Sequence, residues 1–235
     1  MSVDVISLLW RTAPPPRRGP SRGLTIDVVV EAATRLADAS GLEPLTMRAL
    51  AGELGVAPMT LYTYVPGRAE LLELLEDAAF LTMDRAGNSG PWRDRVLAVM
   101  EDNRTLYRAH PWLTSFEPGR PALGPGTIAK YEHELAAFDD CGLSDVDRDA
   151  ALTFVLDFVR AAARSEARSS PETDEAWWAT AGPALAQVLD PSSYPLASRV
   201  GTAAGEAQRS ARHPEHAWRF GTARVLDGLA ALIDG

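Results

Sequence analysis

Apolar residues along this chain recur every three to four positions, which is the spacing of a helix face rather than the alternation of a strand. The clearest case runs from Ile26 to Ser40, where the apolar positions gather on one face. Those positions are Val29, Ala32, Ala33, Leu36 and Ala37. Hardly any stretch alternates with a period of two, so we predict an all-α protein.

Capping residues mark where the first helices begin and end. Thr25 is a good N-cap and Gly41 a good stop for the first helix. Thr46 caps a second, short helix, which Gly55 ends. Pro58 suits the first turn of a third helix, because its missing N–H would have no partner there. The predicted helices are 26–40, 47–54, 58–64 and 68–86.

Longer helices follow in the rest of the chain, and Pro and Gly cluster between them as helix breakers. The predicted spans are 92–109, 125–139, 145–168, 172–189 and 213–233. The last break is "DPSSYPLASRVG", residues 190–201.

The pattern divides the chain into an arm and two domains. Residues 1–23 include "TAPPPRRGPSRG", which cannot pack into a core and is predicted to be a flexible, extended, basic arm. This arm is either a disordered leader or a segment that touches phosphates or the minor groove of DNA. A helix-turn-helix domain is predicted for residues 24–68, and a larger helical domain for residues 69–235.

Charge is distributed unevenly between these parts. The whole chain has a net charge of -9, but residues 1–68 carry seven arginines against six acidic residues. An acidic body with a neutral-to-basic N-terminal end is compatible with DNA binding through that end.

The cellular location follows from other features. Cys141 is the only cysteine, the start of the chain does not read as a signal peptide, and no uncharged stretch approaches the ~20 residues that span a bilayer. We therefore expect a soluble, cytoplasmic protein with no membrane partner.

Two short helices joined by a Gly-containing turn, after a longer packing helix, form the pattern of a helix-turn-helix. Its second helix would present one face to a major groove about 12 Å wide. Side chains that suit contacts with phosphates, base edges and thymine methyls are Pro58, Met59, Thr60, Tyr62, Thr63 and Tyr64. An ordinary short helix pair in any all-α protein has a similar pattern, so both interpretations stay open at this point.

The stretch "LTMRALAGELGVAPMTLYTYVPGRAELLELLEDA", residues 45–78, resembles the DNA-binding region of the tetracycline-repressor (TetR) family of transcriptional regulators. The resemblance implies that Thr46 and Tyr62 bond phosphates and that Arg48 reaches a base edge or a phosphate. Arg68 stands where the family usually has a phosphate-binding lysine. Tyr64 stands where many members have His or Phe, which leaves the operator sequence open. The remaining groove-facing residues would be Pro58, Met59, Thr60 and Thr63.

The larger domain resembles the family's body more weakly, through the Trp92 helix, "PGRP" at 118–121, "CGLS" at 141–144 and a final "LDGLAALI". In this family the body dimerises and binds a small effector. The resemblance therefore implies a ligand-responsive regulator, specifically a repressor. It would bind a palindromic operator as a homodimer and release it when a small, largely apolar or aromatic effector binds.

Small residues at helical spacing near the C-terminus would let two helices approach closely, with bulky residues beside them. The alternative is an ordinary core stripe within one chain, and the family resemblance favours the dimer. The predicted dimer interface comprises Ala161, Ala217, Gly221, Arg224, Val225, Gly228, Leu229 and Leu232.

Aromatic residues with a few polar groups suit a cleft for a flat, mostly apolar ligand. For each such residue an ordinary core or surface place is the alternative. The candidate effector-binding residues are Phe80, Met83, Asn103, Tyr107, His110, Phe116, Arg120, Tyr131, Glu134, Phe158, Trp177 and Trp178.

An enzyme and a protein-interaction module are the two alternative classes of function. An enzyme would need a site, but adjacent acids such as Asp139 and Asp140 do not converge, and Cys141 has no evident base. His213 and His216 have no third ligand at a plausible spacing, so no metal and no cofactor are expected. A helical interaction module without DNA binding is the second alternative.

Overall fold

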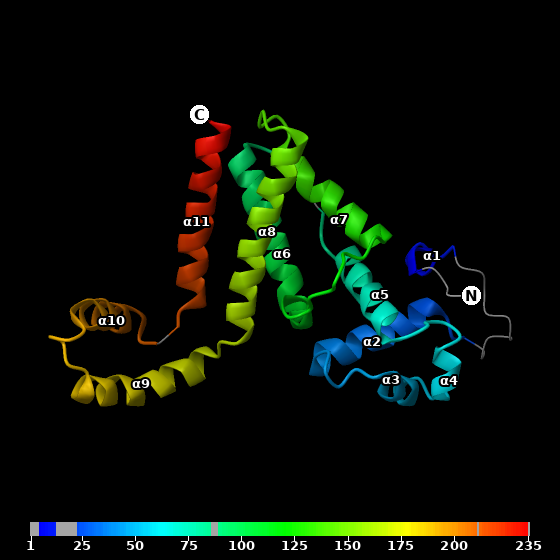
Figure 1. Ribbon diagram of the computed structural model, residues 1–235, viewed down its shortest axis with the longest axis horizontal. Helices are drawn as coiled ribbons and strands as arrows, with labels where there is room; N and C mark the ends of the chain where they lie inside the picture. Colours follow the sequence, from blue (N-terminus) through cyan, green and yellow to red (C-terminus); the bar gives the residue numbers. More distant parts are fainter. Residues whose placement is uncertain (1–4, 13–22, 86–88, 211, 235) are drawn as a thin grey trace.

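The computed structural model describes residues 5–12, 23–85, 89–210 and 212–234, and every regular element in these ranges is a helix (Figure 1). The all-α fold predicted from the sequence is therefore confirmed. The α-helices are α1 (Val5–Leu9), α2 (Ile26–Ser40), α3 (Met47–Glu53), α4 (Pro58–Leu61), α5 (Arg68–Leu81), α6 (Trp92–Ala109), α7 (Pro125–Leu135), α8 (Asp145–Ala167), α9 (Pro171–Val188), α10 (Pro195–Gln208) and α11 (Pro214–Ile233). Two short 3-10 helices are η1 (Pro111–Thr114) and η2 (Ala136–Phe138).

Helices α2, α3 and α4 form a compact head. Thr25 and Thr46 cap α2 and α3 as predicted, since their hydroxyls accept the N–H of Val28 and Ala49. The head is closed by apolar side chains that are fully buried, among them Val29, Leu50, Leu61 and Val65. These contacts, rather than helix length, hold the four-residue helix α4 in place.

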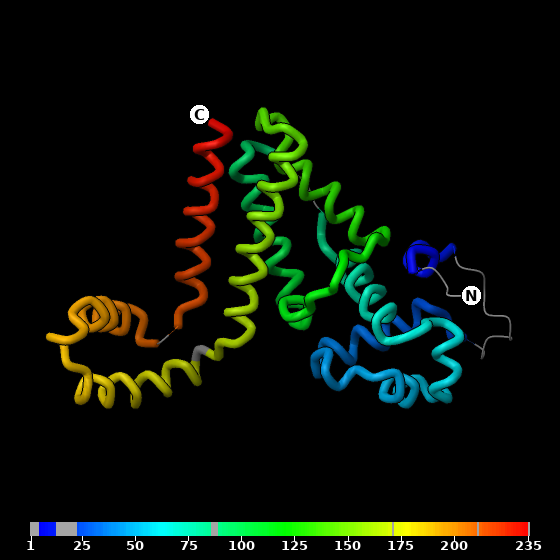
Figure 2. Tube along the Cα trace, viewed as in Figure 1, coloured from blue at the N-terminus to red at the C-terminus, as the bar shows by residue number. Residues whose placement is uncertain are grey.

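Helix α5 joins the head to the body. It packs against α2 on the head side and against α7 on the body side. Helix α7 approaches α5 closely at Gly126. A Cβ at this position would lie 2.0 Å from the Asp77 carbonyl oxygen, so a residue with a side chain does not fit there. In the body, α6, α8 and α11 run side by side (Figure 2). The 3-10 helix η1 packs against α6 and α8, and η2 packs against α6 and α7.

Helices α9 and α10 project from the body as an arm (Figures 1 and 2). No side chain of α10 is buried, and the sequence prediction of a break at 190–201 is wrong beyond Tyr194. Pro195 opens the helix instead of ending one, which is a favoured place for proline.

The predicted flexible arm at residues 1–23 is wrong for Val5–Leu9, which form α1 with Leu8 and Leu9 buried at 2% exposure. Residues 1–4 and 13–22 lie outside the described part of the chain. Among the described residues, no helix is long and apolar enough to cross a membrane.

Candidate DNA-binding and effector sites

The turn between α3 and α4 sets the geometry of the helix-turn-helix. Gly55 adopts a positive φ of 64°, which glycine accepts without strain, and the chain then enters α4 at Pro58. Leu61 is fully buried, so the opposite side of α4 must face outward. Helix α4 lies at the edge of the head, away from the body (Figure 1).

The outward side of this motif carries most of the predicted DNA-contacting residues. Met59 is 74% exposed and Tyr62 is 45% exposed, so both side chains are available for contacts outside the head. Thr60 is half-buried, and its carbonyl accepts the Thr63 hydroxyl at 2.6 Å. The other exposed residues of the set are Thr46, Arg48, Pro58 and Thr63.

Two residues of the predicted set have other surroundings. The expectation that Tyr64 faces the groove is wrong, because this side chain is buried at 7% exposure among the head's core residues. Tyr64 follows the buried Leu61 by three residues, which is the spacing of one helix face, so it lies on the buried side. Arg68 uses its Nε and Nη2 to donate to the carbonyls of Leu45 and Leu42, at 3.0 and 2.7 Å. Arg68 thus ties α5 to the head, and a phosphate contact by its remaining donors stays a prediction.

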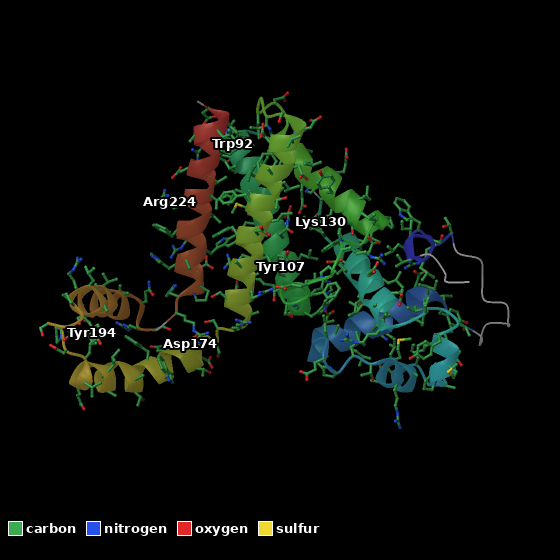
Figure 3. All side chains as sticks on the ribbon, viewed as in Figure 1. Trp92, Tyr107, Lys130, Asp174, Tyr194 and Arg224 are labelled. Atoms are coloured by element: carbon green, nitrogen blue, oxygen red, sulfur yellow. The ribbon has the colours of Figure 1, made fainter. Side chains whose placement is uncertain are left out.

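A buried polar cluster occupies the middle of the body. It consists of the buried Glu76, Asn103, Tyr107, Lys130 and Glu134 and the half-buried Arg160, contributed by α5, α6, α7 and α8. Figure 3 labels two members, Tyr107 on α6 and Lys130 on α7. Three of the six, Asn103, Tyr107 and Glu134, belong to the predicted effector site.

Hydrogen bonds connect α6 and α7 within this cluster. Lys130 Nζ lies 2.7 and 2.8 Å from the two carboxylate oxygens of Glu134, and 5.3 Å from the centre of the Phe80 ring. Asn103 Nδ2 donates to Glu134 Oε1 at 2.5 Å and to the Val99 carbonyl at 2.9 Å. Asn103 Oδ1 is buried and has no hydrogen-bond partner among the described residues. An effector that donates a hydrogen bond would satisfy that oxygen.

A second set of contacts connects α5 to α8. Burial raises the pKa of Glu76 to about 7, although the positive charge of Arg160 and the N–H of Ala122 act in the opposite direction. Asp77 and Glu73 add smaller repulsions that raise it further. Burial likewise raises the pKa of Tyr107, whose hydroxyl is hydrogen-bonded by Arg160. Helix α5, which carries the head, therefore interacts with the body through an ionisable side chain, Glu76, that lies near the positive charge of Arg160.

Several predicted effector residues lie away from this cluster. Tyr131 is on the surface, with its hydroxyl 2.8 Å from Asp149 Oδ1. Trp177 and Trp178 lie on α9, in the projecting arm, where the Trp178 indole packs against Gly182 and Gly205. Phe158 stacks on Trp218 of α11, with ring centres 5.7 Å apart.

Three others lie near the junction of the head and the body. His110 donates or accepts through Nδ1 at 2.8 Å from Asp38 Oδ1, and Asp38 belongs to α2. Arg120 pairs with Glu73 at 3.1 Å beside a groove that Phe116 also lines. The contacts described for His110, Phe116, Arg120, Tyr131, Phe158, Trp177 and Trp178 are with groups outside the polar cluster, and an effector-binding role for these residues stays a prediction. The spacing of aromatic residues along the sequence did not reveal which helix faces converge.

The predicted dimer interface separates into an inner and an outer side. Val225 and Leu229 are buried within the chain, at 7% and 5% exposure, so their assignment to a surface seam is wrong. A Cβ on Gly221 would lie 2.4 Å from the Phe158 ring, so this glycine allows α8 and α11 of one chain to pack closely. The outer residues of the set are Ala161, Ala217, Arg224, Gly228 and Leu232, all exposed.

Large apolar side chains add to this outer side. Phe154 of α8 is 53% exposed, and Phe220 and Leu232 of α11 are 59% and 58% exposed. Figure 3 shows Arg224 pointing away from the bundle on α11, and it pairs with Asp227 of the same helix at 2.5 Å. The two helices thus present an apolar face that one chain leaves uncovered.

Comparison with known proteins identifies the family. The family model described as "Bacterial regulatory proteins, tetR family" matches residues 29–75. The model described as "Tetracyclin repressor-like, C-terminal domain" matches residues 86–233. The chain belongs to the TetR family. The resemblance inferred from the sequence is therefore confirmed, and the two models together cover both the head and the body.

Individual TetR-family relatives agree. The HTH-type transcriptional repressor DrrR1 of Streptomyces coeruleorubidus is 37% identical over 97% of this chain and 85% of its own length. The HTH-type transcriptional repressor Rv1353c of Mycobacterium tuberculosis is 25% identical over 95% of this chain and 87% of its own. The crystal structure of ActR from Streptomyces coelicolor in complex with (S)-DNPA has a TM-score of 0.72 and 26% identity, covering 88% of this chain and 98% of ActR.

These likenesses show that the chain is a TetR-family transcriptional regulator, and they favour neither an enzyme nor an interaction module without DNA binding.

The sequence analysis did not predict three members of the polar cluster: Glu76, Lys130 and Arg160. Glu76 lies on one face of α5 between the apolar Leu72 and Ala79, and the apolar Met83 just beyond the helix continues the same spacing. A charge at that spacing was the signal available in the sequence.

Proposed function

We propose that this protein is a repressor that binds a palindromic operator as a homodimer and releases it when a small effector binds the body. The observation that carries the proposal is the exposed face of α4, where Met59 and Tyr62 protrude from a head whose core is complete without them. A protruding face on the second helix of a helix-turn-helix suits insertion into the major groove. Relatives named as transcriptional repressors support the same direction of control.

The DNA contacts proposed here follow the exposed residues. Tyr62, Thr46 and Thr63 offer hydroxyls to phosphates or base edges, and Arg48 offers a guanidinium. Pro58, Met59 and Thr60 would line the groove. Tyr64 is left out because it is buried. We keep residues 24–68 as the DNA-binding domain and residues 69–235 as the effector-binding and dimerisation domain.

The outer face of α8 and α11 supports a homodimer. Its exposed Phe154, Phe220 and Leu232 would be covered by the same face of a second chain, in the manner of a two-fold interface. A dimer would place two α4 helices at half-sites about 34–36 Å apart, which suits a palindrome.

The buried polar cluster supports the effector site. Burying charged groups costs free energy that pairing offsets only in part, and this cluster joins the helix that carries the head to three helices of the body. ActR, which is 26% identical, was crystallised with the small molecule (S)-DNPA. An effector that donates a hydrogen bond to Asn103 Oδ1 would lie beside the Asn103–Glu134 bond and would move α7 together with α5.

A salt titration of operator binding tests the proposal. The wild-type protein should bind a DNA fragment from its own upstream region specifically, and the affinity should fall as salt rises. Tyr62→Ala should weaken binding about tenfold, because a charge-assisted bond to phosphate contributes on the order of 1.5 kcal/mol. The matched control is Tyr131→Ala, since Tyr131 has similar exposure (42% against 45%) but lies on α7. Absence of specific binding by a folded wild-type dimer at low salt would refute the repressor.

A further inference from the structure

The residues before the head form a second connection between the head and the body. We call Val5–Thr12, which includes α1, the N-terminal strap. A five-residue helix has no stability of its own in water, because nucleation costs more than so few bonds return. The strap is held in place by Leu8 and Leu9, which are buried at 2% exposure, and by its contact with α5.

One hydrogen bond joins the strap to the body. The Trp10 indole N–H donates to the Leu123 carbonyl at 2.8 Å. Leu123 stands just before α7, and the next residues, Gly124 and Gly126, touch Asp77 of α5. Trp10 therefore bonds the part of the body that approaches α5 most closely.

An ion pair joins the strap to the head. Arg11 reaches Asp27 Oδ1 through both Nε and Nη2, at 2.9 and 2.8 Å. Asp27 lies in the first turn of α2. The same guanidinium donates from Nη1 to the carbonyls of Leu8 and Leu9, at 2.6 and 3.2 Å.

The backbone at Arg11 supports this double role. Its φ of 55° is in the left-handed region, which costs a non-glycine residue on the order of 1 kcal/mol. That conformation folds the side chain back over the end of α1 while its other nitrogens reach Asp27. Only the five donors of an arginine in a planar fork make both sets of bonds at once.

The strap lies where it can limit the movement of the head relative to the body. It lies beside α5, with α7 on one side and α2 on the other (Figure 1). The family model of the head begins at residue 29, so the strap lies outside the part common to TetR DNA-binding domains. The head core described above is closed by α2, α3 and α4, and Leu8 and Leu9 of the strap join the same buried apolar cluster.

We propose that Trp10 and Arg11 are positioning residues that hold the orientation of the head relative to the body. This inference rests on the proposed function, since in an operator-bound dimer that orientation fixes the distance between the two α4 helices. A protein with a strap held at both ends should accept a narrow range of half-site spacings. Loosening either end should widen the range without changing the contacts that read each half-site.

The experiment measures operator spacing. Three DNA duplexes carry the protein's own operator with the native spacer, or with one base pair added or removed at the centre. Affinities of the full-length wild-type protein are compared with those of Trp10→Phe, which removes the indole donor, and Asp27→Asn, which removes the ion-pair acceptor. Glu31→Gln is the matched control, because Glu31 is also an exposed, ion-paired carboxylate on α2 but its partner, Arg35, is on the same helix.

The expected result is a change in discrimination rather than in affinity for the native spacer. Each strap variant should reduce the preference for the native spacing by about fivefold, which matches the loss of one hydrogen bond. The double variant should reduce it further, and Glu31→Gln should keep the wild-type preference. Thermal unfolding of each variant verifies that the protein is folded.

Two outcomes would overturn the strap's role: an unchanged spacing preference in the double variant, or an equal loss of affinity for all three duplexes, which would mark a purely structural effect. Failure of the wild-type protein to prefer its operator over unrelated DNA would instead overturn the proposed function, and the strap inference with it.

Discussion

The head and the body each contain a glutamate paired with a basic residue four positions away on a helix, and the surroundings of the two pairs are opposite. On α2 of the head, Arg35 lies 2.8 Å from Glu31, with side chains 59% and 73% exposed. On α7 of the body, Lys130 lies 2.7 Å from Glu134, with side chains 10% and 1% exposed. The sequence spacing and the distance are nearly equal, whereas the exposure to solvent differs strongly.

This difference shows that the two regions use polar residues for different purposes. The head keeps an apolar core and puts hydroxyls and charges outside, so it is a rigid platform for α4. The body encloses charges at its centre and exposes aromatic residues on α8 and α11. An effector can change the hydrogen bonds and ion pairs among buried charged groups, whereas a close-packed apolar core contains no such bonds to exchange.

The largest expected effect is on the buried pair. Lys130→Met should lower the free energy of unfolding by about 3–5 kcal/mol, because it leaves Glu134 buried without its cation. Arg35→Met should cost less than about 1 kcal/mol, since its pair is solvated. Urea unfolding followed by circular dichroism measures both. The double variant Lys130→Met/Glu134→Leu should recover most of the loss, and a failure to recover would show that the pair is not energetically isolated.

The next effect is on pH dependence. Burial raises the pKa of Glu76 from 4.5 to about 7, so the folded protein keeps this proton over a pH range in which the unfolded chain has lost it. The stability contribution is therefore fully present below about pH 4.5 and is lost as the pH rises to about 7. The loss should be about 3 kcal/mol relative to Glu76→Gln, which has no such proton. Unfolding free energies of both proteins at pH 4.5 to 7.5 measure it, and parallel pH curves would contradict the prediction.

The smallest effect compares two helical glycines. Gly126→Ala should destabilise the protein by about 1–3 kcal/mol, because its Cβ would lie 2.0 Å from the Asp77 carbonyl oxygen. Gly52→Ala in α3 has nothing within 4 Å of its Cβ and should stabilise the head by about 0.5–1 kcal/mol. Melting temperatures in the same buffer decide the comparison. Equal shifts of the same sign for both variants would mean that α5 and α7 are not in rigid contact.

The sequence predicted what depends on neighbouring residues. The caps at Thr25 and Thr46 and the breaks at Gly41 and Gly55 act within four residues, and the helices they delimit lie within a few residues of the predicted bounds. The all-α fold and the family followed from such local signals.

What the sequence could not predict depends on distant contacts. Glu76, Lys130 and Arg160 lie on three helices, and their convergence requires knowledge of which helix faces meet. Helix α1 is too short to be predicted from helix propensity. It is stabilised by the burial of Leu8 and Leu9 against the rest of the chain. The hydroxyl of Tyr64 favours the groove in the sequence, whereas the residue lies three positions after Leu61 and is buried with it.

The close contact at Gly126 has a mechanical consequence. No side chain of Gly126 separates α7 from the backbone of α5 at this point, so no side chain can change its conformation to accommodate a movement of α7. Asp77 Oδ1 also accepts the N–H and the hydroxyl of Thr127, which prevents the two helices from separating. A translation of α7 therefore moves α5 by the same amount, and the two helices move as one rigid unit that is held together at Asp77.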